Sequence, residues 1–202
     1  MSINKEEQQY LDILKELIRA DYKDDRTGTG TNSLFCRSMR FDLSKSFPLL
    51  TTKKVFWKGV AIELLWFLSG DTNIKFLVDN GVHIWDEWPY DKYVKALTNE
   101  HGVFCDMLTQ DEFIQKIKDD ADFAKKWGSI GDGGYGAQWR DYGGEYKVIE
   151  GDENSRSFLW NTRKGFDQIS WLINEIKTNP NSRRLIVWAF DPKDHNELNK
   201  AV

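Results

Sequence analysis

The chain has 202 residues, of which 40% are hydrophobic and 30% are charged, and its formal net charge is −4. This balance is typical of a globular chain and does not indicate intrinsic disorder. The acidic charge disfavours general nucleic-acid binding. Apolar runs are shorter than the roughly 18 residues that cross a bilayer, so no membrane partner is expected.

Two further features concern the compartment. Residues 1–14 read MSINKEEQQYLDIL, with no apolar signal core, so secretion is not indicated. The only cysteines are Cys36 and Cys105, which disfavours a disulfide framework and favours a reducing environment. We therefore expect a cytoplasmic protein.

The first half of the chain alternates between helical spacing and turn chemistry. An amphipathic helix is predicted over about residues 6–20, and a Gly- and Thr-rich turn over residues 24–32. A strand follows over residues 34–43, on which Cys36 is predicted to be a buried apolar side chain. An apolar helix over residues 55–69 is predicted to be central, and a short helix ends at Asn80–Gly81.

The second half mixes helices and strands, so the pattern predicts an α+β fold. Helices with a solvated face are expected within residues 94–132, and an exposed insertion or hairpin over residues 145–163. A helix over residues 166–176 should stop at Asn179–Pro180. Residues 183–190, RRLIVWAF, are predicted to form a buried strand entered from two arginines.

The turn around Arg26 is a candidate phosphate site. Its glycines and threonines offer backbone amides and hydroxyls, and the guanidinium is a planar fork suited to phosphate oxygens. The alternative is an ordinary Gly-rich turn with a surface arginine, which composition favours. No Gly-Lys-Ser/Thr follows, so the turn is not a P-loop.

Glu63 is the only acidic residue in an otherwise apolar run that ends in LLWFL. A buried carboxylate is a candidate for proton transfer, because burial raises its pKa. The alternatives are a partly exposed helix residue, or a structural ion pair with Lys58 or Arg40.

Two further groups have both a functional and a structural interpretation. Trp85 and Trp88 flank two acidic residues and could stack on a planar heterocycle, or simply form a corner of the core. Adjacent residues of a strand face opposite sides, so Arg183 and Arg184 could face a ligand and a partner, or be a surface pair. The histidines and cysteines show no metal-ligand spacing.

The chain closely resembles the thymidylate synthase family in six segments that occur in the family's order: DDRTGTGT (24–31), FPLLTTKK (47–54), ELLWFLSGDTNI (63–74), IWDEW (84–88), YGAQWRDY (135–142) and NSRRLIV (181–187). The resemblance covers a single domain over residues 1–202, except for expected insertions near residues 96–129 and 145–165. It implies an α+β fold with a mixed sheet flanked by helices, and a homodimer. The implied reaction is the reductive methylation of dUMP to dTMP, with 5,10-methylenetetrahydrofolate as carbon and hydride donor and no metal.

The resemblance also implies roles for individual residues. Glu63 is similar to the glutamate that relays protons near the pyrimidine carbonyl, and Tyr135 to the tyrosine that assists removal of the C5 proton. The nucleotide phosphate is expected to bind Arg26 and, across the dimer, Arg183 and Arg184. The folate is expected to contact the side chains of Lys53, at its glutamate tail, and of Ile84, Trp85 and Trp88.

Two departures qualify this resemblance. Trp188 stands where the family usually has a small serine, and the sequence ends at Val202, before the family's Pro-Cys-His segment with its nucleophile. We therefore expect the N-terminal part of the enzyme, incomplete at its C-terminus and inactive until a complementing C-terminal chain completes it. The alternatives are a pyrimidine hydroxymethylase and a non-catalytic nucleotide-binding protein.

Overall fold

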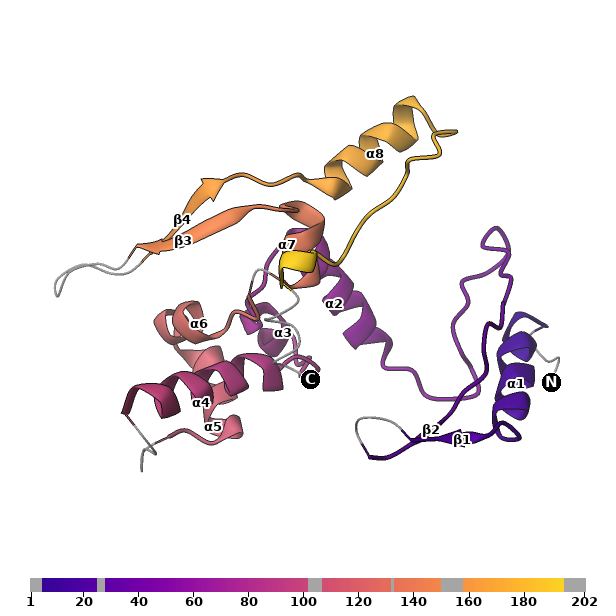
Figure 1. Cartoon of the computed structure of the whole chain (residues 1–202), viewed down its shortest axis with the longest axis horizontal. Coiled ribbons are helices and arrows are strands. Elements are labelled where there is room, and N and C mark those ends of the chain that lie inside the picture. The colour runs from indigo at the N-terminus through magenta and orange to yellow at the C-terminus, as the bar shows by residue number, and fades with distance from the viewer. Residues whose placement is uncertain (1–4, 25–27, 102–106, 132, 150–157, 195–202) are drawn as a thin grey trace. The chain divides into compact units, whose positions relative to one another are not determined.

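The computed structural model describes residues 5–24, 28–101, 107–131, 133–149 and 158–194 (Figure 1). The chain forms two compact units, Met1–Trp57 and Lys58–Val202. In the described residues, no helix is both long enough and apolar enough to span a membrane.

The first unit is organised around α1 (Lys5–Leu17), which confirms the first predicted helix. The short strands β1 (Tyr22–Lys23) and β2 (Thr31–Asn32) pair antiparallel after it. The Glu7 carboxylate joins α1 to the bend at Thr51 and Thr52, far along the chain. It accepts hydrogen bonds from the backbone N–H and the hydroxyl of both threonines, at 2.5–2.9 Å. These bonds lower the pKa of Glu7 to about 2, and the bond from the Thr51 hydroxyl has the largest effect.

The strand predicted over residues 34–43 is wrong. The structure has no strand in these residues, and Phe35 is 95% exposed and Leu43 70% exposed. A strand needs a neighbour to pair its backbone groups, and none lies beside this segment in the described part of the unit. Cys36 is accordingly exposed instead of buried, with a left-handed φ of 48°.

The second unit begins with helices that build a core. They are α2 (Trp57–Ser69), α3 (Lys75–Asp79), α4 (Glu87–His101), α5 (Gln110–Asp119) and α6 (Ala121–Trp127). Figure 1 shows α4, α5 and α6 close together, and α3 packs on α5. The buried apolar side chains of this core are Trp66, Ile74, Leu77, Val78, Val82, Tyr93, Phe113, Ile117 and Ala124.

Local sequence explains where the core helices begin. Thr109 and Glu112 form a capping box at the start of α5, and the Asp120 side chain accepts a hydrogen bond from the Phe123 N–H at the start of α6.

The predicted helix over residues 55–69 is confirmed as α2, but only one side of it is packed. Trp66 is buried, whereas Leu64 and Leu65 are 47% and 56% exposed.

The rest of the second unit consists of α7 (Tyr135–Arg140), the strands β3 (Glu145–Ile149) and β4 (Phe158–Arg163), α8 (Gln168–Thr178) and the 3₁₀ helix η1 (Pro192–Asp194). β3 and β4 pair antiparallel, from Glu145 opposite Arg163 to Ile149 opposite Phe158, with an irregularity after Glu145. This pairing confirms a hairpin in the expected place. The predicted end of the helix at Asn179–Pro180 is also confirmed, since Asn179 is the C-cap of α8.

The described residues contain helices and strands, consistent with α+β, but not the expected mixed sheet. Their strands form two separate two-stranded antiparallel sheets. The buried strand predicted over residues 183–190 is also wrong: this segment carries no strand, and Ile186, Trp188 and Phe190 are about half exposed or more. No described strand lies beside it to form a ladder, so this continuous apolar run stays outside any sheet.

Candidate functional site

An aromatic cluster joins three of the motifs singled out in the sequence. Phe67 lies on α2, Trp85 in the loop before α4, and Tyr135 on α7. The ring centroids are 6.0 Å apart for Phe67–Trp85, 5.3 Å for Phe67–Tyr135 and 6.0 Å for Trp85–Tyr135, and all three pairs meet edge to face. Such geometry is favourable for aromatic pairs, so the three rings hold α2, the loop and α7 together.

Glu63 belongs to the same cluster through a single short hydrogen bond. The indole Nε1–H of Trp85 donates to Oε1 of Glu63 at 2.6 Å, and both side chains are half-buried. Glu63 makes no ion pair with Lys58, although the two lie on the same helix. Within the described residues, the carboxylate is thus held by a neutral N–H donor and not by a cation.

The cluster has an open side. The Trp88 ring lies 5.6 Å from the Trp85 ring at an angle of 44°. Ile84 is 54% exposed and Tyr135 45% exposed, while the two tryptophans are half-buried. Exposed faces of aromatic rings can stack on a flat ring. The structure thus brings together Glu63, Ile84, Trp85, Trp88 and Tyr135, in or directly beside this cluster.

A His–Asp pair next to the cluster was not predicted from the sequence. Asp86 is 8% exposed, and its Oδ2 lies 2.8 Å from Nδ1 of His83. Burial raises the pKa of Asp86, while the hydrogen bond from His83 opposes that shift. No signal in the sequence distinguishes Asp86 from Glu87, which lies between the same two tryptophans and is exposed.

His83 and two lysines border a polar pocket of about 450 Å³ in this unit. The lysines are Lys58, at the start of α2, and Lys118, near the end of α5. In the described residues, no group of three or more His, Cys, Asp or Glu side chains could hold a metal ion.

The paired arginines are not joined to the aromatic cluster by any described contact. Arg183 and Arg184 are both exposed in a turn after α8 and do not open a strand. The backbone N–H of Arg184 donates to Oγ of Ser182 at 3.2 Å, and neither guanidinium pairs with a carboxylate in the part of the chain that the structure describes. Two exposed guanidinium groups that pair with no described carboxylate can donate hydrogen bonds to an anion.

The remaining predicted residues lie elsewhere. Lys53 is exposed in the first unit, at a bend that follows the threonines bound to Glu7. Arg26 and Cys105 lie outside the described residues.

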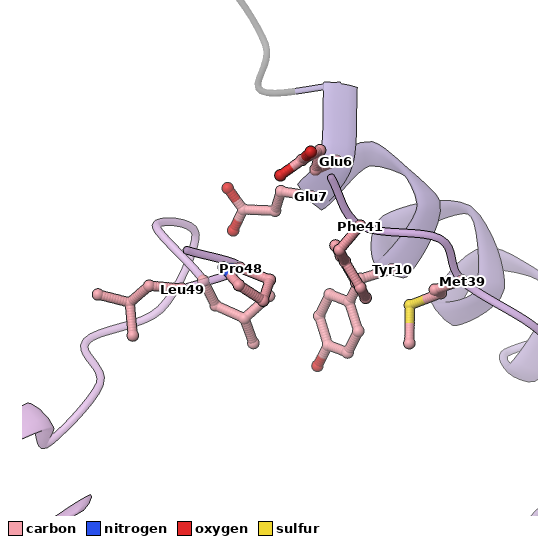
Figure 2. A pocket seen from close by; sticks show the side chains of 8 residues that line it. Glu6, Glu7, Tyr10, Met39, Phe41, Pro48 and Leu49 are labelled. Carbon is pink, nitrogen blue, oxygen red and sulfur yellow. The ribbon is translucent and has the colours of Figure 1, made fainter. Parts of the chain in front are cut away.

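The first unit has a pocket of its own, of about 200 Å³, between α1 and residues 39–50. In Figure 2 the Tyr10 ring points into it, between Met39 on one side and Pro48 on the other. Its wall is mostly apolar, and none of the residues predicted to bind substrate lines it.

Comparison with known proteins decides the family. The family model described as thymidylate synthase matches residues 8–201. The chain belongs to the thymidylate synthase family.

Several curated members of the thymidylate synthase family are similar to the chain over most of its length. The thymidylate synthase of Mesoplasma florum is 44% identical over 193 residues, which cover 94% of this chain and 57% of that protein. Those of Mycoplasma genitalium and Mycoplasma mobile are each 45% identical, over 94% and 96% of this chain and 57% of each relative. The chain therefore spans a little more than half the length of these curated relatives.

Proposed function

We propose that this chain supplies the folate wall, the proton-relay carboxylate and part of the phosphate site of a thymidylate synthase. The proposed reaction transfers a one-carbon unit and a hydride from 5,10-methylenetetrahydrofolate to dUMP, which gives dTMP and dihydrofolate. The observation that carries the proposal is the 2.6 Å hydrogen bond between Trp85 and Glu63. It joins the carboxylate proposed for proton transfer to the ring proposed to stack on folate.

The aromatic cluster fits a folate. The heterocycle would lie against Ile84, Trp85 and Trp88, whose half-buried and exposed faces offer an apolar surface beside the Glu63 carboxylate. Folate supplies the carbon and the reducing equivalent when it is bound. The residues of this chain stack against it, exclude water from one of its faces and hold a proton acceptor near its edge.

The other roles belong to the nucleotide. Glu63 relays a proton near the pyrimidine carbonyl, and Tyr135, whose ring lies 6.0 Å from that of Trp85, assists the removal of the C5 proton. Arg26, Arg183 and Arg184 bind the phosphate dianion, which an acidic surface would otherwise repel. The Lys53 side chain contacts the glutamate tail of the folate.

The 202 residues alone are proposed to be inactive, because covalent attack on the pyrimidine requires a positioned thiolate. Cys36 is exposed in an irregular segment, and neither Cys36 nor Cys105 stands in a Pro-Cys-His motif. A complementing C-terminal polypeptide would supply the nucleophile and cover the exposed leucines of α2, and the completed enzyme would be a homodimer.

The test is formation of dihydrofolate from dUMP and methylenetetrahydrofolate, with the purified chain alone and with the C-terminal polypeptide added. We expect turnover only in the mixture. A hydroxymethylated nucleotide without dihydrofolate would identify a pyrimidine hydroxymethylase instead. Binding of dUMP without turnover in the mixture would identify a non-catalytic protein. Turnover by the chain alone that survives Cys36→Ser and Cys105→Ser would overturn the proposed chemistry.

A further inference from the structure

The Gln168 side chain makes three hydrogen bonds at the start of α8. Its Nε2 donates to the backbone carbonyl of Gln138 at 2.7 Å and to that of Trp188 at 2.8 Å. Its Oε1 accepts from the backbone N–H of Trp188 at 2.8 Å. Gln168 is 4% exposed, so its amide group is largely shielded from water; the bond to Gln138 is buried and the two to Trp188 are partly buried.

The two bonds to Trp188 reproduce those that a neighbouring strand would make. In an antiparallel ladder, a residue donates its N–H to its partner and accepts from the same partner with its carbonyl. The described residues 185–190 have no strand beside them, and the backbone of Trp188 is bound by this amide instead. Figure 1 shows the segment after α8 returning toward α7, whose Gln138 carbonyl takes the third bond.

The anchored segment begins directly after the paired arginines. Along it, Leu185, Val187 and Ala189 are half-buried, while Ile186, Trp188 and Phe190 are exposed. In extended chain, a shift by one residue exchanges the two faces, so whatever holds Trp188 also sets the direction in which the preceding residues project. Trp188 itself is 62% exposed, which shows that its main chain, and not its ring, is what is held.

We propose that Gln168 is a positioning residue for phosphate recognition: by holding the main chain of Trp188, it sets the register from which Arg183 and Arg184 reach the nucleotide phosphate. This inference rests on the proposed function for the two arginines. Gln168 does not touch the nucleotide; its amide takes the place of a strand neighbour and ties the arginine segment to the helix that carries Tyr135.

The experiment compares the affinities of the completed enzyme for dUMP and for deoxyuridine, which lacks the phosphate. Gln168→Leu keeps the approximate size of the side chain and removes all three hydrogen bonds. We expect it to weaken dUMP binding by about tenfold or more and to change deoxyuridine binding by no more than about twofold. Thr109→Ala is the control, because it removes a cap of α5 and destabilises the same unit away from this segment. It should leave the preference for dUMP unchanged.

Arg183→Ala and Arg184→Ala distinguish two kinds of failure. If neither changes the preference for dUMP, the phosphate role of the arginines is wrong. If they reduce it and Gln168→Leu does not, only the positioning role is overturned. Equal weakening of both ligands by Gln168→Leu would likewise overturn positioning in favour of a structural role.

Amide hydrogen exchange gives a second measurement on the 202-residue chain itself. The N–H of Trp188 should be protected in the unmodified chain and in Thr109→Ala, and should exchange at least about tenfold faster in Gln168→Leu. Unprotected exchange at Trp188 in the unmodified chain would overturn the anchor on which the proposal depends.

Discussion

The Nε1–H of Trp85 donates to Oε1 of Glu63 at 2.6 Å, across 22 positions of sequence. This bond places a carboxylate against the edge of an aromatic cluster, and no described side chain forms an ion pair with it. The hydrogen bond and the proposed proton transfer can be tested separately, because Trp85 can lose its donor and Glu63 can be replaced by its amide.

Replacing Trp85 by Phe should lower stability by about 1.5 kcal/mol beyond the effect of a smaller ring. That value is the lower end for a hydrogen bond to a charged group, and Glu63 is only half-buried. The measurement is urea unfolding followed by circular dichroism. Trp88→Phe is the matched control, since it also replaces an indole next to Trp85 by a smaller phenyl ring. Equal losses in the two variants would show that the bond to Glu63 contributes nothing.

Glu63→Gln should separate binding from turnover in the completed enzyme. The amide keeps the shape of the side chain and an oxygen for Trp85, but it cannot carry the proton. We expect dUMP affinity to change by less than about twofold and kcat to fall by about a hundredfold or more. Calorimetry and the dihydrofolate assay provide the two values. Unchanged kcat across the pH range would give Glu63 a purely structural role.

Arg184→Ala should weaken dUMP binding by roughly 1.5 to 3 kcal/mol, because it removes one charge-assisted contact to the phosphate. Arg37→Ala is a suitable control: its guanidinium forms an exposed pair with Glu16 in the first unit. Titration calorimetry with dUMP would measure both. An affinity that neither Arg183→Ala nor Arg184→Ala alters would exclude these arginines from the site.

The pH dependence of the first unit should be governed in part by Glu7. Its pKa falls from 4.5 to about 2 in the folded chain because Thr51 and Thr52 donate to the carboxylate. The unfolded chain therefore binds the proton first, and the stabilisation is present above about pH 4.5 and lost as the pH falls toward 2. Thermal unfolding between pH 6 and pH 2, about the range of this titration, should show a loss of stability that is weaker in Glu7→Gln.

Glu16→Gln serves as the control for that experiment. Glu16 is exposed and its pair with Arg37 is a surface interaction, which contributes little to stability. An acid dependence reduced as much by Glu16→Gln as by Glu7→Gln would mean that the hydrogen bonds from the threonines are not its cause.

The helices could be predicted from local sequence because their hydrogen bonds and caps are local. The apolar spacing of α1, α2 and α8 was sufficient to place them, and Asn179–Pro180 ended α8 where expected. Trp85 and Trp88 were likewise singled out from local sequence, and the resemblance added Ile84; their binding of a ligand stays a prediction. The order of the six motifs also identified the family that the comparison confirms.

Long-range pairing could not be read from the same patterns. Residues 34–43 carry apolar residues at alternate positions and residues 185–190 are a continuous apolar run, two patterns typical of strands, yet a strand exists only where a second one completes its ladder. The described structure provides no such neighbour for either segment, and it binds the second one through the amide of Gln168. The partner of Glu63 was equally unpredictable, since an ion pair with Lys58 or Arg40 was only one of the alternatives and the fold places an indole there. Helical bonds join residues four positions apart, whereas these contacts depend on which distant segments meet in space.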